Sequence, residues 1–559
     1  MKQLIVDLLK KEIKLKPEEI QNLIEIPPSS EMGDYAFPCF SLSKILKKNP
    51  NQIAQDLKSK IKLSKEIEKI ETKGAYLNFF VNKNILCEKI LKDILAKKDN
   101  YGKKEYKLKG MIEFSQANTH KAFHVGHIRG TSLGESLARI AEFFGEKVIR
   151  ANYQGDTGMH VAKWLWCYKK YHSKEKLKND ESWIASIYVD AIKKITNNPE
   201  FQKEVDELNK KLEDKKDKSL NELWKKTRKI SLESFEKIYF QLNTHFDKYY
   251  FESQLEKEGK KIVNELLRKG IAKKSEGAVI VDLEKYNFGV WVLLRSDGTV
   301  LYPAKELALA KKKFKDYSLD WSFYVVGNEQ DLHIKQLLKI LELMKFKKKD
   351  IFYHISYGMV RLPTGKMSSR TGDNILYSDF IKEVTDHAKQ NIKQRFPQIS
   401  QIELDKRALT IAISAIKYSM LKQSPNKNII FQKQEALNFE GDTGPYLLYS
   451  YARASSIIRK SKISPKTNKK ISKLENKETE LCKKLSDFSK IAESSYKNLN
   501  PAIIANYSYQ LSKLFNEFYH ECPVINSENE NFRILLVQCF RIILKNSLKL
   551  LGINVVERM

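Results

Sequence analysis

The sequence predicts an α/β protein with a parallel sheet in its middle and an all-helical region at its C-terminal end. A short apolar, β-prone run covers residues 110–115, and a second one follows at residues 148–153. Between them, apolar residues recur at helical spacing until Gly145 provides a stop. Strand, helix and strand in this order predict a βαβ unit, and from about residue 405 the pattern is helical to the end. The apolar helical positions are Ile128, Leu133, Leu137, Ile140, Ala141 and Phe144.

The size and charge of the chain limit what it can be. A chain of 559 residues is too long for one hydrophobic core, which predicts three or four domains. Hydrophobic residues make up 42% and charged residues 30%, as in a globular protein rather than a disordered one. The net charge of +31 favours polyanionic partners such as nucleic acid. A general enrichment in lysine would give the same excess, so charge alone leaves nucleic-acid binding open.

The cysteines and the N-terminal residues bear on the cellular environment. Six cysteines are scattered along the chain, with no Cys-x-x-Cys pair and no clustering with histidine. This spacing predicts reduced thiols, no disulfide framework, and no protein-bound zinc or other metal. Residues 1–15 lack a hydrophobic signal core, and no apolar run approaches membrane-spanning length. We therefore expect a cytoplasmic protein that makes no use of a membrane.

The motif His124-Val125-Gly126-His127 stands at the start of the helix of the βαβ unit. A helix N-terminus presents unpaired N–H groups and a partial positive charge, and both favour a bound phosphate. Gly126 removes the side chain that would keep a phosphate away, while His124 and His127 can donate hydrogen bonds to its oxygens. A His-x-Gly-His sequence also arises by chance, so this motif alone leaves the site open.

A second motif, GKMSSRTG at residues 365–372, has glycines at both ends, two hydroxyls and two cations. This composition is typical of a loop that closes on a polyphosphate, although a solvated basic turn would share it. Together the two motifs resemble the HIGH and KMSKS signatures of class I aminoacyl-tRNA synthetases. The resemblance implies a Rossmann-like class I synthetase catalytic domain that uses ATP with Mg²⁺. It also implies phosphate contacts from His124, Gly126, His127, Lys366, Ser368, Ser369 and Arg370.

Both ends of the chain resemble arginyl-tRNA synthetases. The segments MGDYAF at residues 32–37 and KGAYLNFF at residues 73–80 resemble the N-terminal additional domain of that family. This resemblance implies that Tyr76 and Asn78 meet an unpaired base of the tRNA D-loop, by stacking and by hydrogen bonds to the base edge. GDTGPYLLYSYAR and the ending LGINVVERM resemble the anticodon-binding helical bundle of the family.

The pattern along the chain then suggests three domains. Within the middle one, about residues 165–274 form a charged helical insertion, mostly a solvated face. The β-prone runs at residues 277–282 and 290–302 predict that the sheet resumes there. The expected domains are an N-terminal α/β additional domain over 1–105, a catalytic domain over 106–400 and a C-terminal all-α anticodon-binding domain over 401–559.

The same resemblance implies a binding site for arginine. Where this chain has Tyr302, Glu306 and Gln330, arginyl-tRNA synthetases have Tyr-x-x-x-Asp and Val-Gly-x-x-Gln. A guanidinium carries five donors in a planar fork, which suit carboxylate and amide oxygens and an aromatic face. Glu113 and Asn118, just before the first motif, complete the expected set. Glu306 is one methylene longer than the aspartate of the family, which would crowd a tight pocket unless the backbone retreats.

These expectations combine into one function. The backbone of Gly358, Met359 and Val360 is expected beside adenine, where N–H and C=O groups can read its edge. The chain is expected to be an arginine–tRNA ligase that activates L-arginine with ATP and transfers it to the 3′ end of tRNA(Arg), as a monomer. Two alternatives stay open: another class I adenylate-forming enzyme with a different substrate, and a catalytically inactive tRNA-binding paralogue. Glu306 leaves room for the first, whereas the two intact motifs oppose the second.

Overall fold

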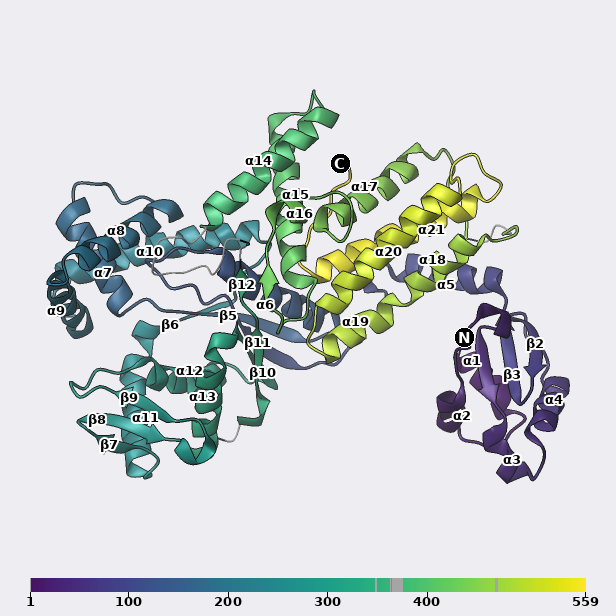
Figure 1. Ribbon diagram of the computed structural model, residues 1–559, viewed down its shortest axis with the longest axis horizontal. Helices are drawn as coiled ribbons and strands as arrows, with labels where there is room; N and C mark the ends of the chain where they lie inside the picture. Colours follow the sequence, from purple (N-terminus) through teal and green to yellow (C-terminus); the bar gives the residue numbers. More distant parts are fainter. Residues whose placement is uncertain (1, 347–348, 362, 364–375, 468–470) are drawn as a thin grey trace. The chain divides into compact units, whose positions relative to one another are not determined.

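The computed structural model describes residues 2–346, 349–361, 363, 376–467 and 471–559. The chain forms two compact units (Figure 1). The first unit comprises Met1–Lys98, Ile457–Ser486 and Leu514–Phe540. The second unit comprises Asp99–Ser456, Asp487–Lys513 and Arg541–Met559, and it contains the expected catalytic residues. Among the described helices, none is both long and apolar enough to cross a membrane.

A five-stranded parallel sheet organises the second unit. Its order is β11-β10-β4-β5-β6, so the chain starts at the central strand β4, moves outward to β5 and β6, and returns on the other side of β4. In such a sheet ligands bind at the carboxyl ends of the strands, where the order reverses. Here that point lies between β4 and β10. The strands are β4 (Lys109–Glu113), β5 (Lys147–Gln154), β6 (Lys248–Phe251), β10 (Trp321–Gly327) and β11 (Phe352–Tyr357).

Helices pack on the sheet through a large apolar core. The βαβ unit expected from the sequence is confirmed, because α6 (Val125–Phe143) connects β4 to β5 and Gly145 follows with φ +81°. Gly134 on α6 lets the helix approach the strand, since a Cβ there would lie 2.2 Å from the ring of Phe114. The main core beneath α11 (Glu256–Arg268), α12 (Tyr302–Asp316) and α13 (Asp331–Leu343) includes residues of β4, β5, β6 and β10.

The helical insertion has a core of its own. It contains α7 (Met159–Cys167), a π-helical turn at Tyr168–His172, α8 (Glu181–Asn197), α9 (Phe201–Asp214) and α10 (Lys218–Gln241), which appear at the far end of the second unit in Figure 1. Trp164, Trp183 and Trp224 are buried in its core, so this segment is more than a solvated face. Within the range of about 165–274, the short strand β6 interrupts the helices and joins the main sheet.

The expectation that the main sheet resumes near residue 277 is wrong. The strands β7 (Lys273–Ser275), β8 (Ala278–Asp282) and β9 (Val290–Leu294) form a separate three-stranded antiparallel sheet. Its burial alternates along β8 and β9, as in a sheet with one face on the core and one in solvent. The parallel sheet itself resumes only at β10.

The chain from α14 to the C-terminus is helical, as expected, apart from the two-residue strand β13 (Ile429–Ile430), which pairs with β12 (Val360–Arg361). Several of the later helices contribute to both compact units. The helices are α14 (Tyr377–Arg395), α15 (Gln401–Leu421), α16 (Lys433–Ala436), α17 (Gly444–Lys460), α18 (Asn476–Ser486), α19 (Phe488–Lys497), α20 (Ala502–Glu521) and α21 (Glu530–Leu550).

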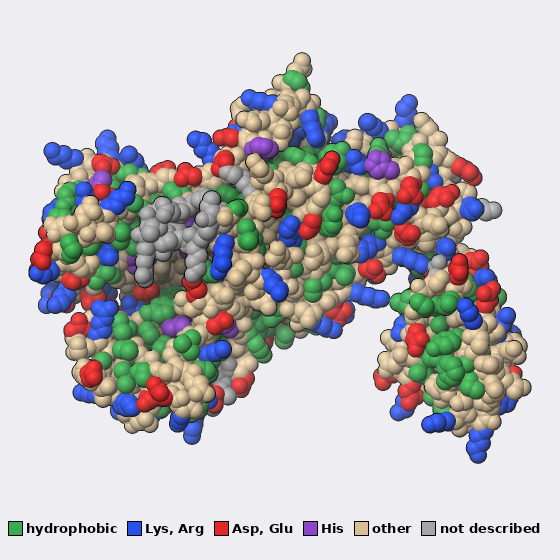
Figure 2. All heavy atoms as spheres, viewed as in Figure 1, with side chains coloured by type: hydrophobic (Ala, Val, Ile, Leu, Met, Phe, Trp, Pro, Cys, Tyr) green, Lys and Arg blue, Asp and Glu red, His purple; other side chains and the backbone are tan. Residues whose placement is uncertain are grey.

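The N-terminal part of the first unit is an α/β structure with its own apolar core. An antiparallel sheet of order β1-β3-β2 packs with four short helices, and α5 (Lys83–Lys97) follows. On the face shown in Figure 2, lysine and arginine side chains are spread over the surface of each unit and interleave with acidic ones. The elements are β1 (Tyr35–Pro38), β2 (Ile67–Lys73), β3 (Tyr76–Val81), α1 (Lys2–Lys10), α2 (Pro17–Leu23), α3 (Phe40–Leu46) and α4 (Pro50–Lys60).

Candidate active site

The first motif lies at the N-terminus of α6, beside the carboxyl end of β4. His124 is the N-cap residue of α6, and its backbone N–H donates to Nδ1 of His127 at 3.2 Å. The two imidazole rings lie 3.9 Å apart between centroids. Gly126 lies beneath the ring of His124, because a Cβ on Gly126 would be 2.9 Å from both Cε1 and Nδ1 of that ring. Only glycine allows this arrangement without displacing His124.

Both histidines are neutral in the free protein. Burial, with a smaller effect from Lys121, lowers the pKa of His124 to about 4. Burial, then His124 and Lys121, lowers the pKa of His127 well below its ordinary value. Since Nδ1 of His127 accepts a hydrogen bond, its proton lies on Nε2, which can donate to a ligand. Nδ1 of His124 is buried and has no hydrogen-bond partner among the described residues. Two neutral donors next to a helix N-terminus suit phosphate oxygens.

The second motif falls on residues that the structure does not describe, including Lys366, Ser368, Ser369 and Arg370. The first described residue after it, Leu376, forms an antiparallel bridge with His124. The backbone N–H of the next residue, Tyr377, donates to the carbonyl oxygen of Phe123 at 2.9 Å. The described chain therefore resumes, after the second motif, directly beside the first motif.

Glu181 at the start of α8 connects these two places. One of its carboxylate oxygens accepts the N–H of Phe123 at 2.9 Å, and the other accepts the N–H of Ser378 at 3.3 Å. Burial raises the pKa of Glu181 to about 7. The hydroxyls of Ser182 and Ser378 add a further contact at 3.1 Å. The insertion thus holds both the loop before α6 and the start of α14.

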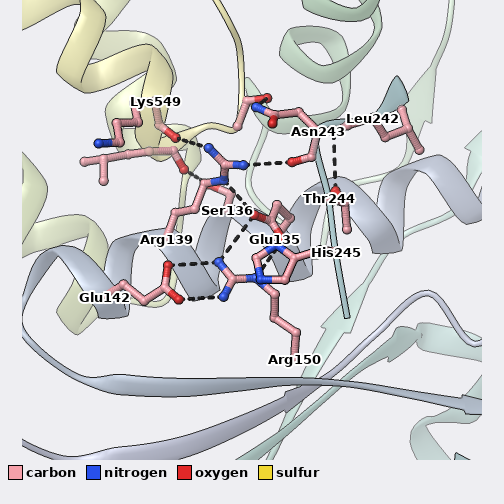
Figure 3. A network of polar contacts seen from close by, with 12 residues as sticks. Glu135, Ser136, Arg139, Glu142, Arg150, Leu242, Asn243, Thr244, His245 and Lys549 are labelled. Carbon is pink, nitrogen blue, oxygen red and sulfur yellow. Dashed lines mark hydrogen bonds and ion pairs between the residues drawn. The ribbon is translucent and has the colours of Figure 1, made fainter. Parts of the chain in front are cut away.

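A buried ion network fixes the middle of α6 (Figure 3). Glu135 accepts from Arg139 at 2.6 Å and from Arg150 on β5 at 2.9 Å. Arg150 also pairs with Glu142, and the hydroxyl of Ser136 donates to a carbonyl oxygen near the end of α21. The carboxylate of Glu135 is fully buried, so removing one of its partners would leave an uncompensated charge. This network keeps α6, and with it the first motif, in place on the sheet.

Three glutamates, which we call the acidic cluster, lie at the carboxyl edge of the sheet: Glu113, Glu252 and Glu306. Glu113 ends β4 and pairs with Lys313 at 2.6 Å, while Glu252 follows β6 and pairs with Lys305 at 3.3 Å. Glu306 is only 3% exposed, and in the described part of the chain no cation pairs with it. The acidic cluster therefore has one carboxylate more than it has lysine partners.

The carboxyl groups of the acidic cluster raise the pKa values of their neighbours. Burial, and next the charge of Glu113, raises the pKa of Glu306 to about 8. Burial and then Glu252, Glu306 and Glu113 raise the pKa of Tyr153, so all three carboxylates act on the same hydroxyl. Oε2 of Glu306 and the hydroxyl of Tyr153 are buried without a hydrogen-bond partner among the described residues. Unsatisfied buried oxygens in a cluster with more carboxyl groups than lysine partners are suited to a cationic donor such as a guanidinium, which would displace the proton of Glu306.

The remaining expected arginine-binding residues lie around the acidic cluster. Tyr302 begins α12, one turn before Glu306, and its exposed ring stacks on His333 with centroids 4.7 Å apart. Asn118 accepts the N–H of Gly155 at 3.2 Å, and a Cβ on Gly155 would meet both Asn118 and Glu252. Gln330 is exposed at the carboxyl end of β10, the neighbour of β4. The structure brings Glu113, Tyr302 and Glu306 together, since Tyr302 hydrogen-bonds Glu306 and the charge of Glu113 acts on both, and it places Asn118 and Gln330 at the carboxyl edge of the sheet.

The backbone expected beside adenine is partly engaged within the protein. The N–H of Gly358 donates to the carbonyl of Pro425 at 2.9 Å, and the N–H of Met359 donates to Asn428 at 2.8 Å. The carbonyl of Met359 accepts from Ile429. In the short parallel pair of β12 and β13, the N–H and C=O of Val360 point away from the partner strand. Val360 is therefore the backbone position of the three that can still bind an adenine edge.

Comparisons with known proteins show to which family the chain belongs. The model "tRNA synthetases class I (R), catalytic domain" matches residues 90–433. The arginine–tRNA ligase of Clostridium kluyveri is 39% identical to the chain, and that of Clostridium perfringens is 38% identical, with all of both chains covered in each case. The chain belongs to the arginyl-tRNA synthetase family.

The rest of the arginyl-tRNA synthetase architecture is matched as well. The model "Arginyl tRNA synthetase N terminal domain" covers residues 1–81, and "DALR anticodon binding domain" covers residues 447–559. The solved structure of Thermus thermophilus arginyl-tRNA synthetase superposes with a TM-score of 0.75 at 26% identity, covering 100% of this chain and 99% of that one. The expected class I catalytic fold with its two flanking domains is confirmed.

The two tRNA-binding residues expected in the N-terminal domain of this arginyl-tRNA synthetase family member lie on β3. Tyr76 is partly exposed and packs edge-on against Phe40, with centroids 5.7 Å apart. Phe40 is 53% exposed, so the two rings form an aromatic surface. Asn78 is only 5% exposed, and Tyr76 is therefore the better placed of the two to stack on a base.

Sequence reasoning missed two residues of the candidate site, Glu181 and Glu252. Tyr153, in contrast, belongs to the polar, glycine-bearing stretch of residues 152–158 after the βαβ unit, whose composition suits the wall of a substrate site. Glu252 follows a four-residue strand that the sequence does not reveal. Glu181 begins a helix of the insertion, far along the chain from the residues that it holds. Neither glutamate carries a local signal.

Proposed function

We propose that this protein is an arginine–tRNA ligase that activates L-arginine with Mg-ATP and transfers the arginyl group to tRNA(Arg). One observation carries the proposal. The acidic cluster has one carboxylate without a cation partner, and it lies at the same edge of the sheet as the N-terminus of α6, which is suited to bind phosphate. A site that receives a guanidinium and a polyphosphate side by side suits arginine and ATP. Membership of the arginyl-tRNA synthetase family supports the same substrates.

In the first step the carboxylate of arginine attacks the α-phosphate of ATP, which forms arginyl-adenylate and releases pyrophosphate. In the second step a ribose hydroxyl at the 3′ end of tRNA(Arg) takes the arginyl group and AMP leaves. Neither step needs a nucleophile from the protein, so its contribution is to position the substrates and to stabilise the charge that develops on the phosphates. Mg²⁺ enters with ATP and neutralises part of that charge.

We assign the phosphate contacts to the first motif. Nε2 of His127 carries the proton and donates to a phosphate oxygen, and Nδ1 of His124 makes a second contact once the ligand is present. Gly126 leaves room for the ring of His124, which a Cβ at this position would displace. A bound triphosphate also favours the protonated imidazole, which would strengthen both contacts as negative charge builds up.

The second motif supplies the remaining phosphate contacts in this proposal. Lys366 and Arg370 neutralise the departing pyrophosphate, while Ser368 and Ser369 orient their segment. The motif lies outside the described residues, so these assignments come from the resemblance to KMSKS. The bridge from Leu376 to His124 supports them, because the described chain resumes beside the first motif shortly after the second one.

For the amino acid, we propose that Glu306 and Glu113 accept the guanidinium N–H groups and that Tyr302 packs on its face. The extra methylene of Glu306 is accommodated within the buried cluster and does not turn the carboxylate into solvent. Asn118 and Gln330 contact the polar atoms of the amino acid, and Glu252 adds negative charge for the ammonium group. The backbone of residues 358–360, with Val360 foremost, holds adenine.

The larger partner is tRNA(Arg), which we expect to contact Tyr76 and Asn78 in the N-terminal domain and the DALR domain at the C-terminus. We propose that the enzyme works in the cytoplasm as a monomer. The three expected domains, 1–105, 106–400 and 401–559, remain part of this proposal.

ATP–pyrophosphate exchange measured with each of the twenty amino acids, with and without tRNA(Arg), tests the function. Exchange is expected with arginine and with no other amino acid. Exchange with a different amino acid would show another class I activating enzyme. If the protein bound tRNA(Arg) but supported neither exchange nor aminoacylation with arginine, it would be an inactive tRNA-binding paralogue.

A further inference from the structure

The helical insertion brings together a cysteine, a histidine and an aspartate that the proposed reaction does not use. Cys167 ends α7, His172 ends the π-helical turn that follows, and Asp190 lies on α8, in the part of the second unit labelled α7 and α8 in Figure 1. Sγ of Cys167, one ring nitrogen of His172 and one oxygen of Asp190 all lie within 4.8 Å of one another. These three donor types are the ones that zinc prefers.

The π-helical turn is what allows Cys167 and His172 to meet. In a regular α-helix, five residues rotate the side chain by about 140° beyond one full turn, which would point the two side chains in different directions. A π-helical turn aligns residues i and i+5 instead, and such turns are frequent at functional sites. The turn at Tyr168–His172 directly follows Cys167, so Cys167 and His172 project to one side. The departure from regular helix geometry at this point is therefore consistent with a functional site.

The distances between the donor atoms fit a tetrahedral metal ion. Sγ of Cys167 lies 3.4 Å from Oδ2 of Asp190, and Nε2 of His172 lies 3.0 Å from the same oxygen. In tetrahedral zinc sites, bonds of about 2.3 Å to sulfur and about 2.0 Å to nitrogen and oxygen place S and O about 3.5 Å apart, and N and O about 3.3 Å apart. The S–O and N–O separations in the structure agree with these expected values to within about 0.3 Å.

The surroundings of His172 resemble those of a metal-binding histidine. Zinc-bound histidines usually donate their second ring N–H to a carboxylate, which fixes the ring. Here Nδ1 of His172 lies 2.6 Å from Oε1 of Glu175, and the other oxygen of Glu175 accepts the indole N–H of Trp183 at 2.9 Å. Glu175 is therefore held in place and directs Nε2 of His172 toward Cys167 and Asp190. Cys167 is buried, whereas the side chains of His172 and Asp190 are 22% and 33% exposed and leave a path for an ion.

We propose that Cys167, His172 and Asp190 bind one Zn²⁺ ion, with water as the fourth ligand and Glu175 orienting His172. Binding replaces the thiol proton of Cys167, which is released to solvent, by a zinc–sulfur bond. The ion joins the end of α7 to the middle of α8. This proposal replaces the expectation, drawn from linear spacing, that the chain holds no zinc. It does not depend on the arginine–tRNA ligase function.

Zinc titration of the full-length protein, prepared free of metal, tests this proposal. We expect one Zn²⁺ per chain, with competition against a chromophoric chelator giving the affinity. Cys167→Ser and Asp190→Asn should each weaken binding at least about 100-fold, and Glu175→Gln, which only orients His172, about tenfold. Cys39→Ser is the matched control, because Cys39 is also a buried free cysteine but lies far along the chain in the N-terminal domain.

Cobalt provides a readout specific to the thiolate. Co²⁺ bound to the wild type and to Cys39→Ser should show a sulfur-to-cobalt charge-transfer band, which Cys167→Ser should lack. Circular dichroism shows whether each variant is folded, and His172→Gln, at a partly exposed position, replaces any variant that is not. Zinc binding by Cys167→Ser and His172→Gln as tight as that of the wild type, or a cobalt complex without the band, would overturn the proposal. The cluster would then be a metal-free hydrogen-bonded group.

Discussion

We expect the affinity for arginine to rise steeply with pH, because Glu306 carries a proton in the free enzyme. Burial, and next the charge of Glu113, raises the pKa of Glu306 to about 8, so its carboxyl group is mostly neutral at pH 7. A guanidinium is permanently protonated and pairs with the carboxylate form. Arginine binding must therefore expel the proton from Glu306, and this step becomes easier as the pH rises.

The size of the effect follows from the raised pKa. Below that pKa, the fraction of carboxylate changes about tenfold for each pH unit. Between pH 6.5 and 8, the KM for arginine should therefore fall roughly 15-fold, which corresponds to about 1.6 kcal/mol of binding free energy. Glu306→Gln should raise the KM by a further large factor, because truncating one partner of a buried charge pair removes about 2–5 kcal/mol.

Pyrophosphate exchange at saturating ATP and tRNA, measured across this pH range, gives the KM for arginine. Calorimetry in two buffers with different ionisation enthalpies should show close to one proton released per arginine at pH 6.5. Glu258→Gln, an exposed carboxylate on α11, is the matched control and should keep the pH dependence of the wild type. The reasoning is refuted if the wild type shows no pH dependence, or if Glu306→Gln retains the same slope.

Three further changes test other parts of the site. Gly126→Ala places a Cβ 2.9 Å from two ring atoms of His124, so kcat/KM for exchange should fall at least about tenfold while the circular dichroism spectrum stays unchanged. Because burial raises the pKa of Glu181 to about 7 from an ordinary 4.5, its neutral form favours folding at low pH and this contribution is lost as the pH rises through 7. In denaturant titrations, the stability of the wild type relative to Glu181→Gln should fall by about 2–3 kcal/mol between pH 5 and 8; a constant difference would contradict this. Lys366→Ala should lower kcat for exchange at least about tenfold with little change in the KM for ATP, and a change in that KM alone would exclude a role late in the reaction.

The βαβ unit could be predicted from the sequence because all of its signals are local. The apolar residues of α6 follow the helical period, and Gly145 with φ +81° provides the turn into β5. Trp321–Gly327 likewise reads as a buried strand, since β10 lies between two neighbours and is apolar along most of its length. A helix or strand whose own apolar pattern determines which residues are buried can be predicted without knowing the elements that it packs against.

The errors concern strands whose place depends on distant partners. β6 has only four residues, and what makes it a strand is pairing with β5, almost a hundred residues earlier. The runs that form β8 and β9 alternate between buried and exposed positions. A parallel sheet covered on both faces calls for continuous apolar strands, so the alternation already favoured a separate antiparallel sheet. The β-prone composition was correct, but composition alone does not say which sheet a strand joins.

Some residues of the candidate site could likewise be predicted from local or family motifs, whereas others are revealed only by the fold. His124, Gly126 and His127 form a local motif, and the family pattern gives Glu113 and Glu306. Glu181, in contrast, lies 58 residues from Phe123 and 197 from Ser378, and only the fold shows that one carboxylate accepts both backbone N–H groups. A glutamate at the start of a charged helix normally stabilises that helix alone. Here the same position is buried, and because each carboxylate oxygen accepts from a different segment, the insertion holds the loop before the first motif to the start of α14.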